Sequence, residues 1–277
     1  MRVLGLTKPK ISIHRSITCV LLAISLCPAS LGIAQELGPE STATIAEQYL
    51  LAAANQERAA LGLPQLHRDP RLADAAAQHA RQMAAHSSIS HQFTGEAELT
   101  QRGASAGVPF SEISENVGEA PSVAQIHDMW MHSEHHRTNL LDPAIDSIGV
   151  SVIPRGRELY AVEDFARTVR SASLEEQESA IGSLVAGPAG RTRSIALDLN
   201  PATVSAARQT CTMETGYAGL NKPGFVMRFT TDSLTRLPDQ LKTRMASGRY
   251  AHVAVGACAS KRQTNFTDYT FAVLLYP

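Results

Sequence analysis

The strongest constraint on the fold is the order of two hydrophobic patterns between residues 44 and 167. Apolar residues recur at helical spacing from Thr44, in the alanine-rich stretch 71–86, and again after Pro121. A β-branched segment, residues 148–153, and a second predicted strand, residues 159–165, then flank a short Pro-Arg-Gly turn. Helices followed by a closing β-hairpin indicate a layered α+β domain over residues 44–167.

The N-terminus has the pattern of a secretory signal peptide. Four basic residues (Arg2, Lys8, Lys10 and Arg15) precede the apolar run 17–26, and small residues at 32–34 precede Gln35. The run has about ten residues, whereas a membrane-spanning helix needs roughly 20. A lipid anchor on Cys27 is disfavoured by the bulky Leu26 before it. We therefore predict that residues 1–34 are cleaved, and that the protein is exported to the periplasm or the extracellular space with no membrane span left.

The remaining segment, residues 172–277, has its own pattern of helices and strands. A helix is expected from Leu174 and another after Asn200-Pro201, and alternating apolar residues predict strands at 224–230, 250–257 and 269–276. We see no repeat of the first half in this sequence. The pattern predicts a second, smaller α+β domain.

The cysteines agree with an exported protein. Cys19 and Cys27 lie in the predicted signal peptide, so the mature chain keeps only Cys211 and Cys258. In an oxidising compartment we expect these two to form a disulfide, worth about 4 kcal/mol on the chain-entropy model. Two buried free thiols are the alternative.

Charge and motifs exclude several function classes. The net charge is −1 and the isoelectric point is about 6.8, so no overall field favours binding to nucleic acid. The sequence has no phosphate-binding glycine loop, no HExxH zinc motif and no GxSxG nucleophile motif.

Five short motifs in the first half carry a family resemblance. They are, in order, Asn55-Gln56-Glu57-Arg58 with Gly62-Leu63-Pro64, the run Ala76 to Ala84, Ser90-His91, Glu115-Asn116 with Gly118, and Trp130 followed by His136-Arg137-Thr138-Asn139-Leu140-Leu141. Together with Ile148-Gly149-Val150 and Asp164-Phe165, they make residues 44–167 resemble the bacterial exported form of the CAP superfamily. This superfamily comprises cysteine-rich secretory, antigen 5 and pathogenesis-related proteins, also called SCP-like proteins.

The resemblance implies a three-layer α-β-α sandwich with a central cleft. The cleft of that family is lined by two histidines and two glutamates, and in some members it holds a divalent metal. His91 matches the first histidine, Glu115 the first glutamate, and His136 the histidine of the bacterial motif. Ser133 stands where animal and plant members have the second glutamate, and Glu134 is one position along. Asn116 is expected beside Glu115 in the cleft.

The residue types indicate what such a cleft could do. Neutral imidazoles bind first-row metals such as zinc, so His91 and His136 are candidate ligands. Glu115 could orient an imidazole or accept a proton from water. His132 and His136 would share one face if the fourth helix continued through both. The competing interpretation is that His91 is a packed structural histidine and that Glu115 and Asn116 brace the backbone.

Three functions remain open from the sequence. The first is a binding module whose cleft receives a small ligand, lipid, peptide or cell-wall component. The second is a metal-dependent, protease-like hydrolase that uses His91, His136 and Glu115 as its catalytic candidates. The third is a structural or interaction protein of the cell envelope. We favour binding, because no nucleophile and base can be paired from the sequence.

Overall fold

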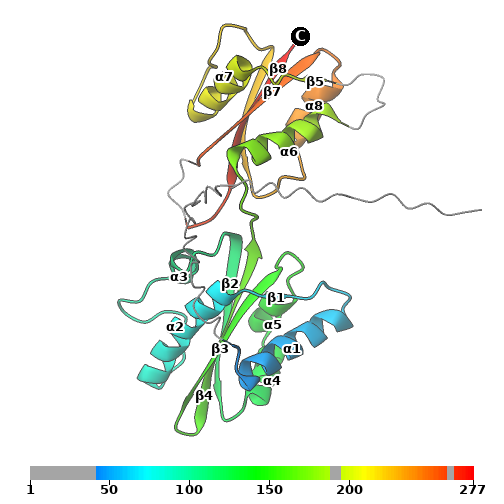
Figure 1. Ribbon diagram of the computed structural model, residues 1–277. Coiled ribbons are helices and arrows are strands. Elements are labelled where there is room, and N and C mark those ends of the chain that lie inside the picture. The colour runs from blue at the N-terminus through cyan, green and yellow to red at the C-terminus, as the bar shows by residue number, and fades with distance from the viewer. Residues whose placement is uncertain (1–41, 188–194, 261–264) are drawn as a thin grey trace, which may run out of the picture. The chain divides into compact units, whose positions relative to one another are not determined.

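Two four-stranded sheets, each with its own helices, organise the chain in a computed structural model that describes residues 42–187, 195–260 and 265–277 (Figure 1). The predicted signal peptide, residues 1–34, lies outside the described residues. In the described part, no helix combines the length and the apolar character needed to cross a membrane.

The N-terminal sheet has the strand order β1-β3-β4-β2, in which only the β1–β3 pair is parallel. Its elements are α1 (Ile45–Ala60), β1 (His67–Arg68), α2 (Pro70–His86), α3 (Leu99–Ser105), β2 (Phe110–Ala120), α4 (Val123–His132), α5 (Glu134–Leu141), β3 (Ser147–Arg155) and β4 (Glu158–Thr168). Helix α2 packs on β3 and β4 from one face, and α1, α4 and α5 lie on the other side (Figure 1). This is the three-layer α+β arrangement that the sequence predicts.

Local sequence explains where the main helices begin. The Thr44 hydroxyl accepts a hydrogen bond from the Glu47 amide, and the Glu47 carboxylate accepts one from the Thr44 amide, which forms a capping box at α1. Asp69 caps α2 and Pro70 is its first residue. Close packing of α2 on the sheet requires Gly149, because a Cβ there would lie 2.1 Å from the Leu72 carbonyl carbon.

Two elements differ from the expectations. Strand β2 has eleven residues, although its segment has no alternating hydrophobic pattern. The fourth helix does not continue to His136, because Ser133 adopts an extended conformation (φ −96°, ψ 122°) that ends α4 and starts α5. His132 and His136 therefore do not share one helix face.

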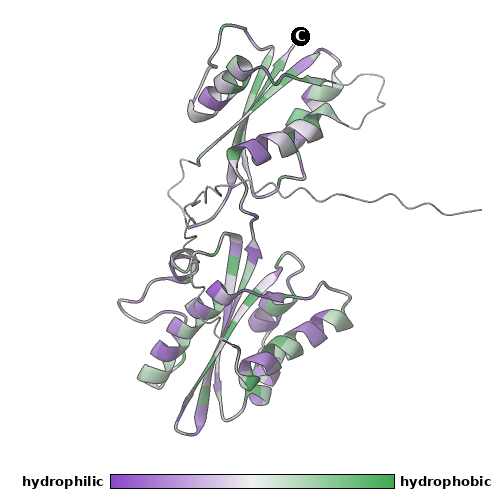
Figure 2. Cartoon of the chain, viewed as in Figure 1, coloured by the Kyte–Doolittle hydropathy of each residue, from purple (hydrophilic) through white to green (hydrophobic). Residues whose placement is uncertain are grey.

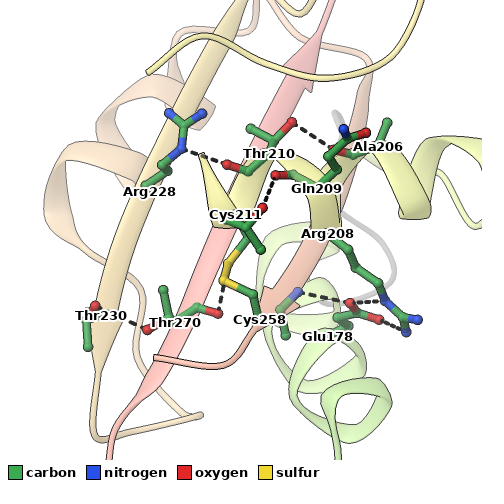
Figure 3. Close-up of a disulfide and its surroundings, with 12 residues drawn as sticks. Glu178, Ala206, Arg208, Gln209, Thr210, Cys211, Arg228, Thr230, Cys258 and Thr270 are labelled. Atoms are coloured by element: carbon green, nitrogen blue, oxygen red, sulfur yellow. Dashed lines mark hydrogen bonds and ion pairs between the residues drawn. A yellow bond between two sulfur atoms is a disulfide. The ribbon is translucent and has the colours of Figure 1, made fainter. Parts of the chain in front are cut away.

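The C-terminal sheet has the strand order β5-β7-β8-β6. Its elements are α6 (Leu174–Ala186), β5 (Ala196–Leu197), α7 (Pro201–Thr212), β6 (Phe225–Thr231), α8 (Asp239–Ala246), β7 (His252–Cys258) and β8 (Tyr269–Tyr276). The strands and helices expected in residues 172–277 are present, with ends within about two residues of the expected ones for most of them. The expected disulfide joins Cys211 in α7 to Cys258 at the end of β7, with 5.9 Å between the two Cα atoms (Figure 3).

The two sheets have the same topology. In each, a helix precedes a two-residue strand, and a second helix that begins with proline comes after that strand. The last two strands form an antiparallel pair. The short strand pairs in parallel with the first strand of that pair in both sheets. The backbone bonds correspond too: Asp69 N donates to Ile148 O, and Asp198 N donates to Val253 O. The fold thus repeats although the sequence shows no repeat.

This correspondence aligns the sheets residue by residue. The row Gly149, Asp164 and Glu115 of the N-terminal sheet matches the row Ala254, Leu274 and Val226 of the C-terminal sheet. On the opposite face, the row Val150, Glu163 and Asn116 matches Val255, Val273 and Met227. Strands β7 and β8 are hydrophobic along most of their length, whereas the N-terminal strands mix both kinds of residue (Figure 2). Polar side chains in the middle of the N-terminal sheet are therefore not a requirement of the topology.

Candidate functional site

Glu115 is the centre of a buried polar cluster at the edge of the N-terminal sheet. It lies on β2, which is an edge strand, and its side chain is only 2% exposed. One carboxylate oxygen, Oε1, contacts Nδ1 of His91 at 2.8 Å. The other, Oε2, accepts a short hydrogen bond from the Arg102 guanidinium, whose side chain is 3% exposed. Both oxygens of this buried carboxylate are therefore paired with cationic or polar donors, as burial of a charge requires.

His91 is the exposed member of the cluster. It lies in the segment between α2 and α3, and 63% of its side chain is accessible. The hydrogen bond with Glu115 raises the pKa of His91 above its usual value, although partial burial opposes this. Since Nδ1 faces the carboxylate, Nε2 is the nitrogen that remains for a ligand. The structure thus brings His91 and Glu115 together, as the sequence analysis expects.

Hydrogen bonds from two asparagines fix α5 to the edge of β2. Asn116 donates from Nδ2 to the backbone oxygen of His136 at 3.1 Å. Asn139 donates to the Glu115 backbone oxygen at 3.2 Å and to Oδ1 of Asn116 at 3.1 Å. Asn116 therefore positions the backbone of His136, and its side chain is buried in that role.

His136 is close enough to His91 for their charges to interact. Burial, and after it the positive charge of His91, lower the pKa of His136. A lowered pKa keeps this imidazole neutral, which is the state that binds metals. Of the other two expected cleft residues, Ser133 occupies the junction of α4 and α5, and Glu134 is exposed at the start of α5.

Two further carboxyl groups are fully buried on β4: Asp164 on the same face of the sheet as Glu115, and Glu163 on the opposite face. Asp164 is paired in register with Glu115, and Glu163 with Asn116. Burial, and then the charge of Glu115, raise the pKa of Asp164 well above its usual value. Burial likewise raises the pKa of Glu163 to about 8. A pKa of about 8 keeps Glu163 mostly protonated at neutral pH, and the raised pKa of Asp164 favours its protonated, neutral form.

In residues 42–187, 195–260 and 265–277, no group of three or more His, Cys, Asp or Glu side chains is arranged to hold a metal ion. His91 and His136 stay the candidate ligands expected from the sequence, and Glu115 contacts Nδ1 of His91 in the manner of a residue that orients a ligand. A metal held this way would keep most of its coordination positions for water or a ligand.

Sequence reasoning missed three members of the cluster: Arg102, His79 and Asp164. Arg102 and Asp164 are long or acidic side chains that usually lie at the surface. His79 lies among the apolar residues on the buried face of α2. Because a buried polar side chain must have hydrogen-bond partners, this position could have indicated that His79 belongs to a polar cluster. No spacing in the sequence pairs any of them with Glu115.

Comparison with known protein families gives one match. Residues 51–165 match the model of the cysteine-rich secretory protein (CAP) family, which confirms the resemblance stated for residues 44–167. Among the curated proteins, none matches the chain.

Several solved structures are similar to part of the chain. An extracellular protein with an SCP domain from Bacillus anthracis is 27% identical, with a TM-score of 0.41, over 44% of this chain and 40% of its own. A cysteine-rich secretory protein from Staphylococcus aureus is 25% identical, with a TM-score of 0.38, over 44% and 38%. An outer surface protein from Borrelia burgdorferi is 20% identical, with a TM-score of 0.41, over 44% and 91%. The match thus spans about two fifths of the Bacillus and Staphylococcus chains.

Proposed function

We propose that the protein is an exported binding module whose ligand-binding side chain is His91, in the part of the chain, residues 51–165, that matches the CAP family model. The observation that supports this most is the contact between Nδ1 of His91 and the buried carboxylate of Glu115, at 2.8 Å. A carboxylate behind an imidazole fixes the ring and its tautomer, and leaves Nε2 directed to a ligand.

A divalent metal such as zinc is the first ligand to test. His91 and His136 are the candidate donors, and the depressed pKa of His136 favours its neutral form. A bound ion would act as a Lewis acid for an oxygen or nitrogen ligand from a peptide, lipid or cell-wall component. Two neighbouring residues would hold these donors in place. Glu115 fixes the ring of His91 through Nδ1, and Asn116 fixes the backbone of His136.

The metal-dependent hydrolase has less support. In that alternative, Glu115 accepts a proton from an attacking water, for which a carboxylate oxygen must be accessible. Both oxygens of Glu115 are instead occupied, one by His91 and one by Arg102, and the side chain is buried. The structure therefore favours an orienting role for Glu115 over a catalytic one.

Zinc titration of the mature protein, purified without a histidine tag, tests the proposal. We expect zinc to perturb the imidazole NMR signals of His91 and His136 first, with binding weakened at least tenfold in His91→Ala, since removal of an imidazole ligand or its orienting partner typically costs 10–100-fold. His132→Ala is the matched control, because His132 is an exposed histidine on α4 whose ring lies 3.4 Å from the carboxylate of Asp128.

The outcomes separate the competing interpretations. Equal zinc binding by the wild type, His91→Ala and His132→Ala would contradict a site at His91. Loss of folding in His91→Ala would instead favour the structural interpretation, since an exposed ligand should be dispensable for stability.

A further inference from the structure

We propose that His79 is a positioning residue of the His91 site, and that it acts as a doubly protonated imidazolium that fastens the segment carrying His91 to α2. His79 lies on α2, and its side chain is fully buried. Nδ1 lies 2.8 Å from Oε1 of Glu96, and Nε2 lies 2.7 Å from the backbone oxygen of Ser90. Both partners belong to the segment 87–98 between α2 and α3, which includes His91.

The protonation state follows from the types of these partners. A carbonyl oxygen and a carboxylate oxygen can only accept hydrogen bonds. A neutral imidazole has one N–H, so it could satisfy one of these acceptors and would face the other with a lone pair. With Glu96 present as a carboxylate, a ring between two acceptors at 2.7 and 2.8 Å is satisfied on both sides only when both nitrogens carry protons.

The charges around His79 agree with this state. The groups that face it are Glu96, which is 2.8 Å away, and Glu115, whose Oε2 is 3.8 Å from Nε2. Arg102 on α3 supplies one positive charge to Glu115, and burial, followed by the charge of Glu115, raises the pKa of Asp164 and favours its neutral form. An imidazolium at His79 gives two buried carboxylates two cations, whereas a neutral ring would leave one negative charge without compensation.

The bonds of His79 are arranged to position His91. The ring holds the backbone at Ser90, which is the residue before His91, and it holds Glu96, whose other oxygen accepts from the Phe93 amide at 3.0 Å. Arg102 holds the same segment from α3, through the backbone oxygens of His91 at 3.3 Å and Ala97 at 3.1 Å. His79 and Arg102 together fix the segment on both sides of His91, which keeps its ring on Glu115.

NMR of the wild type without ligand tests the protonation state. We expect both ring nitrogens of His79 to carry protons at pH 7 in a long-range ¹H–¹⁵N spectrum of the imidazoles. One protonated and one bare nitrogen would overturn the imidazolium. The proposal rests on His91 as the binding side chain, but because no ligand is added, this result is independent of whether zinc binds.

Two variants test the positioning role. His79→Phe keeps the ring shape and removes both donors, so we expect the amides of residues 88–97 to exchange at least about tenfold faster with solvent, as expected when local opening becomes easier. The pKa of His91 should also fall toward its ordinary value as its contact with Glu115 loosens. His79→Gln retains a donor and should give smaller changes in both, and it serves if the Phe variant does not fold.

His132→Phe is the control, since it changes an exposed histidine on a different helix. Unchanged exchange and an unchanged pKa of His91 in a folded His79→Phe protein would overturn the positioning role. A lowered melting temperature with both readouts at their wild-type values would show a merely structural role.

Discussion

At the residue scale, the candidate site consists of charges that the fold buries and pairs. Glu115 accepts from His91 and Arg102, and Asp164 lies in register beside it. A buried ion pair of this kind is weak evidence for stability, because desolvation of both ions offsets their attraction. The C-terminal sheet forms with the apolar residues Val226 and Leu274 at the matching positions, so the fold does not require these buried charges. We therefore infer that the cluster serves to hold His91.

The first prediction concerns the Glu115–Arg102 pair. Glu115→Val leaves the buried Arg102 guanidinium without its carboxylate, so we expect a loss of about 3–5 kcal/mol in the free energy of unfolding. Glu115→Val combined with Arg102→Met removes both charges and should cost less than Glu115→Val alone. Urea unfolding measures both values. Additive losses in the double variant would show that the two side chains are not coupled.

The second prediction concerns pH and Glu163. Burial raises the pKa of Glu163 from 4.5 to about 8, so between these values the folded protein holds a proton that the unfolded chain has lost. Linkage then makes the free energy of unfolding decrease as pH rises through this window, by on the order of 5 kcal/mol in total. Glu163→Gln should therefore gain stability relative to the wild type from pH 5 to pH 8.

Unfolding in urea at several pH values measures that difference. Glu134→Gln is the control, because Glu134 is exposed and should leave the wild-type pH dependence in place. A constant difference between Glu163→Gln and the wild type across pH 5–8 would mean that Glu163 is ionised in the folded protein at neutral pH.

At the scale of elements, helices and the closing hairpin could be predicted, whereas the strand and the short helix that carry the site could not. Caps at Thr44 and Asp69 and the β-branched residues of β3 are local signals. Strand β2 contains Glu115, Asn116 and other residues that are depleted in strands, so its propensity points away from its structure. The polar residues of the candidate site lower the strand propensity of this segment, so the sequence pattern does not predict β2.

The site was predictable to the extent that a known family supplies a pattern. His91 and Glu115 could be paired from the resemblance, but the contacts of His79 with Ser90 and Glu96 depend on how the segment after α2 folds back on it. The break at Ser133, which separates His132 from His136, is likewise a single backbone conformation that no periodicity encodes.

The third prediction uses the register that the two sheets share. Asp164 and Leu274 occupy matching positions on β4 and β8, and both are fully buried. Asp164→Asn replaces a neutral carboxyl with an amide of the same shape, so we expect a change below about 1 kcal/mol. Leu274→Asn places the same amide in an apolar row, so a loss of about 3–5 kcal/mol is expected.

Thermal unfolding of both variants provides the comparison. Equal losses would mean that the site row and the apolar row tolerate an amide alike, which would remove the basis for treating the polar row as specialised. The same Asn side chain is introduced at both positions. The difference between the two stability losses therefore measures how well each position accommodates an amide in place of its own residue.

At the scale of the whole molecule, the same topology occurs once with a polar cluster and once with an apolar interior and a disulfide. The bond between Cys211 and Cys258 joins α7 to β7, close to the paired Arg208 and Glu178 (Figure 3). Glu178 also accepts from the Ala257 amide at 2.9 Å, which fixes α6 to the same strand. The disulfide, the Arg208–Glu178 pair and the Glu178–Ala257 hydrogen bond therefore join α6, α7 and β7 to one another.

The last prediction separates the disulfide from the site. Cys211→Ser with Cys258→Ser removes a covalent bond that closes a loop of 47 residues, so the free energy of unfolding of the C-terminal sheet should fall by about 2–4 kcal/mol. His91, Glu115 and His79 all lie within residues 44–167, so the pKa of His91 should stay at its wild-type value in the folded variant. Hydrogen exchange measured peptide by peptide, together with NMR titration of His91, gives both quantities in one protein. A change in the pKa of His91 would mean that residues 44–167 and 172–277 do not fold as separate domains, because a stability loss confined to one independent domain cannot reach a side chain in the other.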